Sequence, residues 1–272
     1  MHTLRFIPHT WQVIGIVAIL ASRPGTAEQV SPLTSASSSD AQTVTAQAHL
    51  MGTDFTITIA DSISSDTAQR AITAAFAEVA RIENLMSEWK PTSEISAINQ
   101  SAGSAWVKVS DETFSILKSA YTLAERSNGA FDPTWAALRG IWQFNSQTPT
   151  LPLKSTLTAA LQNVGYKYLL FDATQKTVYL SRQGAALGLG AIAKGYGIDR
   201  ATEILQSHGL KNFLVDGGGD IRLVGEKSTE PWSVGIQHPR RLNQLLLTLP
   251  VRDRAVVTSG DYQRYFTLGK KR

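Results

Sequence analysis

The chain of 272 residues is 43% hydrophobic and 18% charged, enough apolar material for a sizeable core in one or two domains. Its formal net charge of +4 comes from scattered lysines and arginines and two short basic runs, which argues against a nucleic-acid-binding stripe. The sequence contains no cysteine, which excludes disulfides, thiolate catalysis and a lipid-modified amino-terminal cysteine.

The amino-terminal residues have the pattern of an export signal. Arg5 lies in a short polar start, residues 11–21 form an apolar run, and residues 25–27 (Gly-Thr-Ala) form a small-x-small cleavage site. The run is shorter than the about 20 residues that span a membrane, so we expect a secretory signal peptide over residues 1–27. The alternative is an uncleaved anchor. Residues 28–42, rich in Ser, Thr and Ala, are predicted to form a flexible linker.

The folded body is expected to cover residues 43–272. Phe55, Ile57 and Ile59 alternate with threonines, which is the pattern of a half-buried strand. Residues 51–53 (Met-Gly-Thr) are expected to form the entry to this strand.

Two amphipathic helices are predicted next. Asp66 is expected to cap the first helix, which ends before Pro91 because proline blocks its continuation. The second follows Ser110 and stops at residues 128–129 (Asn-Gly). Their apolar positions recur every three or four residues: Ala68, Ile72, Phe76, Val79, Ile82 and Met86 in the first, and Phe114, Leu117, Tyr121 and Ala124 in the second.

The second half of the chain is richer in strands. Residues 166–172 and 177–181 are expected to pair, and a central helix is expected from about Lys194 to His208. Further strands are predicted over residues 213–215, 221–224, 232–236, 244–251 and 255–257. Because strands come in runs rather than in alternation with helices, an α+β fold is favoured over a doubly wound sheet.

Residues 187–199 (LGLGAIAKGYGID) form the most distinctive stretch. Gly188 and Gly190 open it, and Lys194 falls in the first turn of the central helix. A helix start presents unpaired N–H groups and a partial positive charge, and a lysine there is favourable when it shares an anion such as phosphate with them. The alternative is an ordinary strand-to-helix turn with a solvated lysine, because short glycine motifs are weak signals.

Three loops combine an aspartate with glycines or small hydroxyl residues. They cover residues 129–134, 216–220 and 258–261. The three glycines before Asp220 predict either space for a ligand or a tight turn closed by Asp220 and Arg222. Asp132 is either a turn residue or, with Phe131 and two nearby tryptophans, part of an aromatic-walled cleft for a flat cofactor. Trp89 is likewise either a core residue or a wall for ring stacking.

The spacing of possible metal ligands and the absence of two catalytic motifs limit the reactions that the sequence can support. The five histidines lack the spacing of zinc ligands, so zinc is set aside. A hard cation such as Mg²⁺ needs only carboxylates, carbonyls and a substrate phosphate, which the sequence permits. Neither a G-x-S-x-G elbow nor a Walker lysine motif occurs. The residues alone therefore favour a phosphate-bearing, aromatic ligand.

Six motifs occur in order along the chain: residues 51–53, 86–89 with 93–96 and Asn99, 129–134, 189–196 with Asp199, 215–222 and 258–262. Over about residues 43–266 they resemble the ApbE-type FAD:protein FMN transferases, exported bacterial proteins formerly called thiamine-biosynthesis lipoproteins. The resemblance implies an α+β, T-fold-like single body with mixed or antiparallel sheets and packed helices.

The resemblance also implies an activity and a site. With Mg²⁺, such enzymes cleave the pyrophosphate of FAD and transfer FMN to a threonine or serine hydroxyl of a partner flavoprotein, and some release FMN and AMP. By matching positions, FAD would be bound by Met51, Trp89, Ala130, Phe131, Asp132 and Lys194, and the backbone carbonyl of Ala191 would be one Mg²⁺ ligand. No catalytic residue is assigned. The location implied is periplasmic, with a membrane tether as the alternative.

The sequence departs from the family in two respects. Gly188 stands where the family usually has an acidic residue, and the family continues past Tyr265 and Phe266 with segments that carry further Mg²⁺ ligands and a catalytic histidine. A C-terminally truncated member of the family is therefore expected. Two alternatives to transfer activity are an exported flavin-binding protein without catalysis and an FAD pyrophosphatase.

Overall fold

The structure is a computed structural model that describes residues 43–142, 150–241, 243–260 and 267. The predicted signal peptide and linker, residues 1–42, lie outside the described residues, as does Asp261 of the last predicted loop. The predicted domain boundaries at residues 27 and 42 therefore stay predictions.

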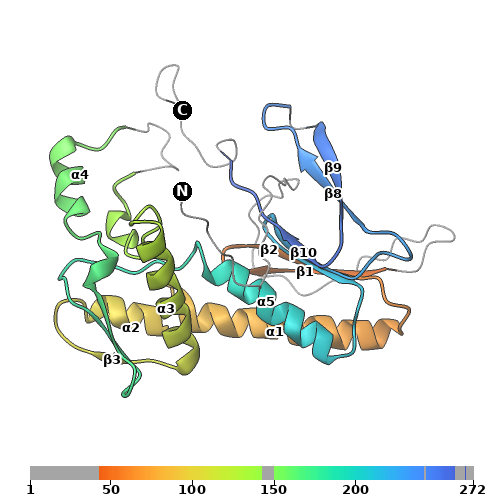
Figure 1. Cartoon of the computed structure of the whole chain (residues 1–272), viewed down its shortest axis with the longest axis horizontal. Coiled ribbons are helices and arrows are strands. Elements are labelled where there is room, and N and C mark those ends of the chain that lie inside the picture. The colour runs from red at the N-terminus through yellow and green to blue at the C-terminus, as the bar shows by residue number, and fades with distance from the viewer. Residues whose placement is uncertain (1–42, 143–149, 242, 261–266, 268–272) are drawn as a thin grey trace, which may run out of the picture. The chain divides into compact units, whose positions relative to one another are not determined.

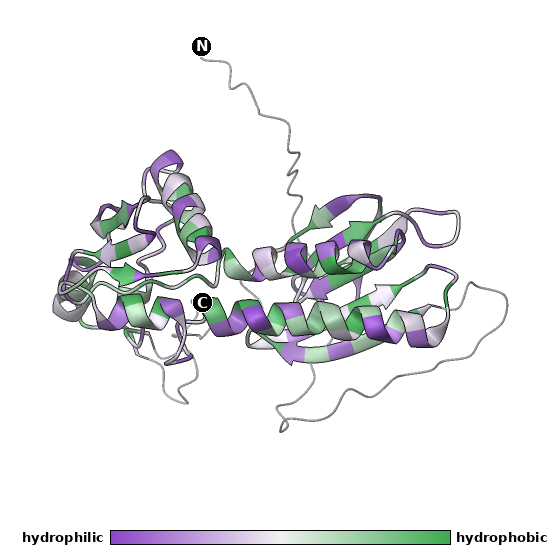
Figure 2. Ribbon diagram, turned by 90° about the horizontal axis from the view of Figure 1, so that it is seen from below, coloured by the Kyte–Doolittle hydropathy of each residue, from purple (hydrophilic) through white to green (hydrophobic). Residues whose placement is uncertain are grey.

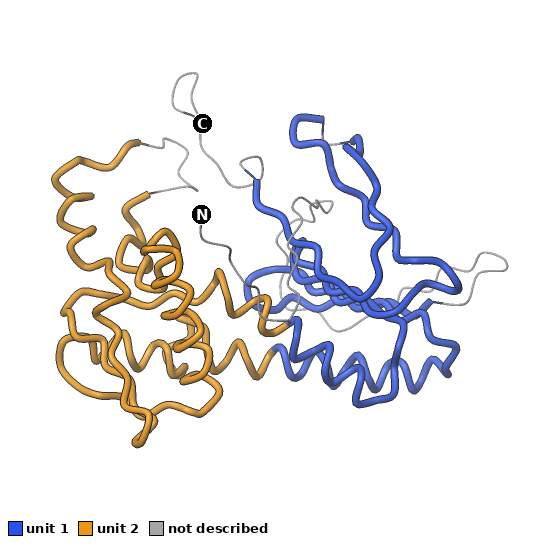
Figure 3. The backbone as a smooth tube through the Cα atoms, viewed as in Figure 1, with its two compact units in different colours: residues 1–79, 198–262 blue, residues 80–197, 263–272 orange. Residues whose placement is uncertain are grey.

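Contacts within the chain divide it into two compact units, shown in Figure 3. Unit 1 comprises residues 1–79 and 198–262, and unit 2 comprises residues 80–197 and 263–272. The divisions fall inside the helices α1 (Ser65–Met86) and α5 (Ala193–Ser207).

Unit 1 is built on a five-stranded antiparallel sheet with the strand order β1-β2-β6-β7-β10. Its strands are β1 (Val44–Leu50), β2 (Thr53–Ile59), β6 (Phe213–Gly217), β7 (Asp220–Val224) and β10 (Arg254–Val256). The predicted alternation in β2 is confirmed, since Phe55, Ile57 and Ile59 are fully buried on one face of the sheet.

Both faces of this sheet are covered (Figure 1). Residues of α1 and α5 cover one face, where Ile72, Val79, Ile198 and Leu205 join the side chains of β2 and β6 in one buried cluster. The hairpin of β8 (Trp232–Gln237) and β9 (Leu245–Val251) covers the other face in a second cluster, which includes Trp232, Val234, Ile236 and Val251. The sheet is therefore the middle layer of unit 1.

The amphipathic pattern of α1 is confirmed, but its predicted cap is wrong. All six predicted apolar positions are buried, and apolar and polar residues alternate along the helix in Figure 2. Ser64, rather than Asp66, caps the helix, because its Oγ accepts a hydrogen bond from the Thr67 N–H at 3.2 Å. Asp66 lies one position inside the helix and pairs with Arg70.

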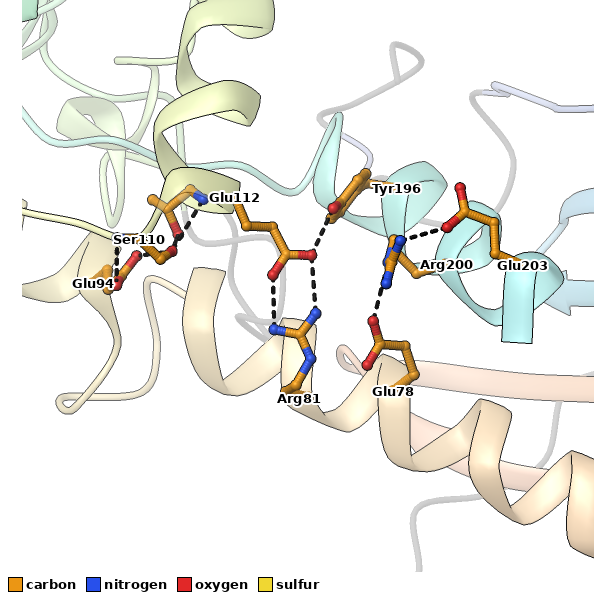
Figure 4. Close-up of polar contacts among 9 residues, drawn as sticks. Glu78, Arg81, Glu94, Ser110, Glu112, Tyr196, Arg200 and Glu203 are labelled. Carbon is orange, nitrogen blue, oxygen red and sulfur yellow. Dashed lines mark hydrogen bonds and ion pairs between the residues drawn. The ribbon is translucent and has the colours of Figure 1, made fainter. Parts of the chain in front are cut away.

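Unit 2 is mainly helical with a small sheet. Its elements are α2 (Glu94–Gln100), β3 (Val107–Lys108), α3 (Asp111–Arg126), η1 (Ala136–Leu138), α4 (Lys154–Leu161), η2 (Tyr166–Tyr168), β4 (Leu169–Asp172) and β5 (Thr177–Leu180). Ser93 and Ser110 cap α2 and α3 through their side chains. Glu94 accepts 2.8 Å hydrogen bonds from both the N–H and the hydroxyl of Ser110, which joins the two helix starts (Figure 4).

The α+β class is confirmed, with antiparallel pairing in all three sheets of the described residues. The expected pairing of residues 166–172 with 177–181 is also found, although residues 166–168 form a 3₁₀ turn and the strand begins at Leu169. Five elements were not expected from the sequence, namely β1, α2, β3, η1 and α4. Because β1 pairs with β2, residues 51–52, which were expected to form the entry to β2, are the turn of the β1–β2 hairpin.

None of the helices in the described ranges combines the length and the apolar character that a bilayer crossing requires.

Candidate functional site

Trp89 lies on a closed turn that follows α1 in unit 2. Its N–H donates to Ser87 Oγ at 3.2 Å, and Ser93 Oγ donates to the Ser87 carbonyl at 2.6 Å across the turn. Trp89 is 68% exposed, so the alternative that it is a core residue is wrong. The guanidinium of Arg139 lies over the indole, with its carbon 4.1 Å from the ring centroid. The indole is therefore available to a ligand and already has one cationic neighbour.

The predicted loop at residues 129–134 is fixed by its own hydrogen bonds. Asn128 and Gly129 have φ of 53° and 80° and end α3 in the left-handed conformation. Asp132 Oδ1 accepts bonds from the N–H and the hydroxyl of Thr134 at 2.8 and 2.6 Å, and Oδ2 accepts the Tyr166 N–H at 2.8 Å. Three protein donors thus use the carboxylate, so its established part in this structure is to shape the loop that presents Ala130 and Phe131.

This loop lies directly beside the glycine turn that precedes α5. The Gly188 N–H donates to the Pro133 carbonyl at 2.9 Å, and Trp135 Nε1–H donates to the Gly188 carbonyl at 2.9 Å. A side chain at Gly188 would approach the indole of Trp135 to 2.9 Å. Trp135 therefore fills the space that a side chain at Gly188 would need.

The side chain of Asn99 anchors the same turn from α2. Asn99 Nδ2 donates to the Leu187 carbonyl at 3.0 Å, and Asn99 Oδ1 accepts the Leu187 N–H at 2.7 Å. Three segments distant in sequence thereby meet in unit 2: α2, the loop at residues 129–135 and the turn at residues 187–190.

The start of α5 agrees with the sequence prediction. The helix begins at Ala193, and half-buried Lys194 lies in its first turn, while Gly190 and Ala191 are exposed. Tyr196 donates from its hydroxyl to Glu112 at 2.6 Å, and Arg81 pairs with the same carboxylate at 2.7 Å (Figure 4). The helix start is therefore bound to α3 and to α1 within unit 2.

The remaining predicted flavin residue, Met51, lies in unit 1. Met51 and Gly52 have φ of 51° and 72°, the geometry of a two-residue type I′ hairpin turn. A left-handed conformation is unfavourable for a methionine by about 1–2 kcal/mol. Local strain of this kind concentrates at functional positions, and Met51 also packs against the buried cluster of the sheet.

The glycines before Asp220 form a tight turn rather than an open space. Gly218 and Gly219 have φ of 60° and 92° at the turn between β6 and β7, and Asp216 Oδ1 accepts the Gly219 N–H at 2.9 Å. A Cβ atom at Gly218 would overlap the Thr53 hydroxyl, and one at Gly217 would lie 2.8 Å from the Phe55 ring. The close approach of β2 accounts for these two glycines.

Asp199 is a titratable group of unit 1 with a clearly altered environment. Burial raises its pKa from 3.8 to about 6, with a further rise from Glu203 and an opposing effect from Arg222. It lies six residues after Ala193, the first residue of α5, in the motif that carries Lys194. Arg200, its neighbour, pairs with Glu78 of α1 at 3.0 Å (Figure 4).

The described residues do not form a complete metal site. Within these ranges, no three histidine or acidic side chains gather closely enough to hold a metal ion. The Ala191 carbonyl would be a single ligand, whereas Mg²⁺ takes an octahedral set of oxygens. A surface cavity of about 370 Å³ lies against α3, and its lining contains none of the predicted flavin residues: Ser115, Lys118, Ser119, Thr122, Leu123 and Arg126.

The arrangement can be compared with known proteins. The model of the ApbE family matches residues 51–272. The chain is 34% identical to the FAD:protein FMN transferase of Treponema pallidum over 72% of this chain and 58% of that protein, and 30% identical to that of Klebsiella pneumoniae over 72% of this chain and 61% of that protein. The chain thus spans about 60% of the length of these curated relatives.

Solved structures agree with this match. The crystal structure of the ApbE protein from Thermotoga maritima is 31% identical, with a TM-score of 0.74 over 89% of this chain and 74% of that chain. The flavin transferase ApbE from Vibrio cholerae is 28% identical, with a TM-score of 0.70 over 83% of this chain and 74% of that chain. Since the family model covers most of the sequence and the fold agrees, this chain belongs to the ApbE family.

Proposed function

We propose that this chain is an FAD:protein FMN transferase, which moves FMN from FAD to a threonine or serine hydroxyl of a partner flavoprotein. The curated relatives bear this name. The observation that carries the proposal is the junction of Gly188 with Pro133 and Trp135, because it places the loop at residues 129–134 beside the turn that leads to Lys194.

The proposed transfer of FMN takes place at the start of α5, beside this junction. The pyrophosphate of FAD would be bound at the start of α5, where the helix dipole and Lys194 attract negative charge. The acceptor hydroxyl oxygen attacks the phosphorus on the FMN side, the bond to the bridging oxygen breaks, and AMP leaves while the hydroxyl loses its proton. Positive charge near the leaving phosphate stabilises the transition state, which makes Lys194 the residue with the largest expected effect.

Two finer parts of the proposal concern Mg²⁺ and location. Mg²⁺ would neutralise phosphate charge when bound, and the Ala191 carbonyl is the one ligand that the resemblance assigns. Because the described residues give no complete ligand set, no step above depends on the metal. We further propose export to the periplasm, on the basis of the signal-peptide pattern in residues 1–27.

Incubation with FAD, Mg²⁺ and a flavoprotein acceptor tests the proposal. The expected result is flavin fluorescence on the acceptor after denaturing electrophoresis, abolished in Lys194→Ala and retained in Lys154→Ala, an exposed lysine at the start of α4. AMP release without an acceptor would instead identify an FAD pyrophosphatase. Quenching of FAD fluorescence with neither product would identify a binding protein without catalysis, and equal activity in the two variants would remove Lys194 from the site.

A further inference from the structure

The contact between Trp89 and Arg139 joins a predicted flavin residue to the segment that follows a predicted flavin loop. Trp89 belongs to the turn after α1, and Arg139 follows η1 directly, downstream of the loop at residues 129–134. The guanidinium carbon lies 4.1 Å from the centroid of the indole, within the range of a cation–π contact. Arginine is suited to this contact because its guanidinium is planar, delocalised and weakly hydrated.

A buried carboxylate forms an ion pair with the guanidinium. Arg139 Nη2 lies 3.5 Å from Glu88 Oε1, and the Glu88 side chain is only 7% exposed. The Arg139 side chain is 31% exposed, and Trp89 is 68% exposed. The three side chains thus form a series from the interior to the surface, in which Glu88 orients Arg139 and Arg139 covers part of the indole.

The arrangement of Glu88, Arg139 and Trp89 differs from an ordinary surface ion pair. An ion pair that served only to neutralise charge would not need a neighbouring exposed tryptophan. An exposed indole without a neighbour loses conformational freedom when a ligand stacks on it, and this loss weakens binding. A guanidinium fixed over one part of the ring restricts the indole before the ligand arrives. The remaining exposed surface of the indole is then presented in a fixed orientation.

We infer that Arg139 is a positioning residue, held by Glu88, which orients Trp89 to stack on a planar ring of FAD. The inference rests on the proposed function, since FAD is the ligand. Arg139 acts through Trp89 and has no assigned contact with the reacting phosphates. The flavin and the adenine offer the same stacking chemistry, and separate titrations with FMN and with AMP distinguish them.

Titration of FAD against the wild type and four variants tests this inference, with quenching of flavin fluorescence as the readout. Arg139→Gln is expected to raise the Kd about tenfold and to reduce the quenching at saturation, and Glu88→Gln to have a smaller effect in the same direction. Arg139→Lys keeps the charge without the planar group and is expected to fall between Arg139→Gln and the wild type. Arg126→Gln, at an exposed arginine near the end of α3, is the matched control and is expected to match the wild type.

A double-mutant cycle separates positioning from a general structural effect. In a Trp89→Phe background, Arg139→Gln should change the Kd by less than it does in the wild type, while the thermal midpoints show that each variant is folded. Arg139→Gln with the Kd and quenching of Arg126→Gln would overturn the inference and leave the proposed function intact. A wild-type chain that binds no FAD would overturn both.

Discussion

The pair of Gly188 and Trp135 shows how one large side chain can determine the residue opposite it. The indole of Trp135 donates to the Gly188 carbonyl and occupies the space that a side chain at Gly188 would need. The glycine at this position is therefore coupled sterically to a tryptophan 53 residues earlier in the chain. The effect of a substitution at Gly188 on stability should therefore depend on the residue at position 135.

We expect Gly188→Asp to lower the free energy of unfolding by about 2–3 kcal/mol, because the new side chain meets the indole at 2.9 Å and is charged in a buried position. Adding Trp135→Val should recover part of this loss by opening the space. Gly190→Asp is the control, because nothing lies within 4 Å of its Cβ position. Urea unfolding of the four proteins measures the effect, and equal stability of the two single aspartate variants would contradict this explanation.

Asp199 predicts a pH dependence of stability. Its pKa is raised from 3.8 to about 6 by burial, so the folded state binds the proton more tightly than the unfolded state. The stabilisation is complete below about pH 4 and is lost as the pH rises through 6. Asp199→Asn keeps a neutral side chain at every pH and should gain about 1 kcal/mol relative to the wild type between pH 5 and pH 7, allowing for solvent screening.

Urea unfolding of the wild type and Asp199→Asn at both pH values measures this gain. A difference between the two proteins that is the same at pH 5 and pH 7 would show that Asp199 does not titrate in this range in the folded state.

At the scale of elements, the two type I′ hairpins of unit 1 differ in how strictly they require glycine. Gly52 in the first turn has open space around its Cβ position, whereas Gly218 in the second turn faces Thr53 of β2. Both have positive φ, so both disfavour a side chain, but only Gly218 adds a steric overlap.

Gly218→Ala is therefore expected to cost about 2–4 kcal/mol of stability, against about 1 kcal/mol for Gly52→Ala. Thermal unfolding followed by circular dichroism compares the two. Thr53→Ala combined with Gly218→Ala should recover part of the difference, because it removes the hydroxyl that the new methyl group overlaps. Equal losses for the two single variants would show that the backbone conformation alone sets the cost.

Elements with a strong local pattern could be predicted from the sequence, and those that depend on distant partners could not. The helices α1, α3 and α5 have regular apolar spacing or clear stop signals, and their extents are confirmed. The strand β1 was missed because its inward positions include Ala46 and Ala48, whose small side chains give little alternation. Ser64 and Asp66 are both good caps, and the chain uses the serine.

In the candidate site, too, features with a local sequence pattern could be predicted and contacts between distant residues could not. The position of Lys194 at the start of α5 agrees with the sequence analysis, whereas the exposure of Trp89 decides between two alternatives that the sequence left open. Arg139 was not predicted, because its partner lies 50 residues away and no local pattern links an arginine after a 3₁₀ turn to an indole. The contacts that join the loop at residues 129–134 to Gly188 are equally non-local.

At the scale of the whole molecule, the described chain exposes apolar side chains on β9. Leu245, Leu246 and Leu247 are all exposed, whereas Leu249 packs against the buried cluster beneath the β8–β9 hairpin. β9 also lies at the edge of its two-stranded sheet, and an exposed apolar edge strand favours association with other chains.

Leu246→Lys is expected to reduce self-association and binding of an apolar dye while changing stability by less than about 0.5 kcal/mol. Leu249→Lys, on the same strand, should instead lose about 2 kcal/mol or more because it places a charge against the buried cluster. Light scattering and dye fluorescence measure the first effect, and urea unfolding measures the second. Unchanged scattering in Leu246→Lys would show that β9 does not drive association.

The anchoring of Leu187 by Asn99 has a consequence for motion near Lys194. The amide of Asn99 gives Leu187 the pair of hydrogen bonds that a neighbouring strand would otherwise provide. Because one rotatable side chain, rather than a sheet, protects the Leu187 amide proton, the rate at which that proton exchanges with deuterium records how often the approach to the helix opens. The exchange rate of this one amide proton therefore measures how often the segment that precedes Lys194 opens.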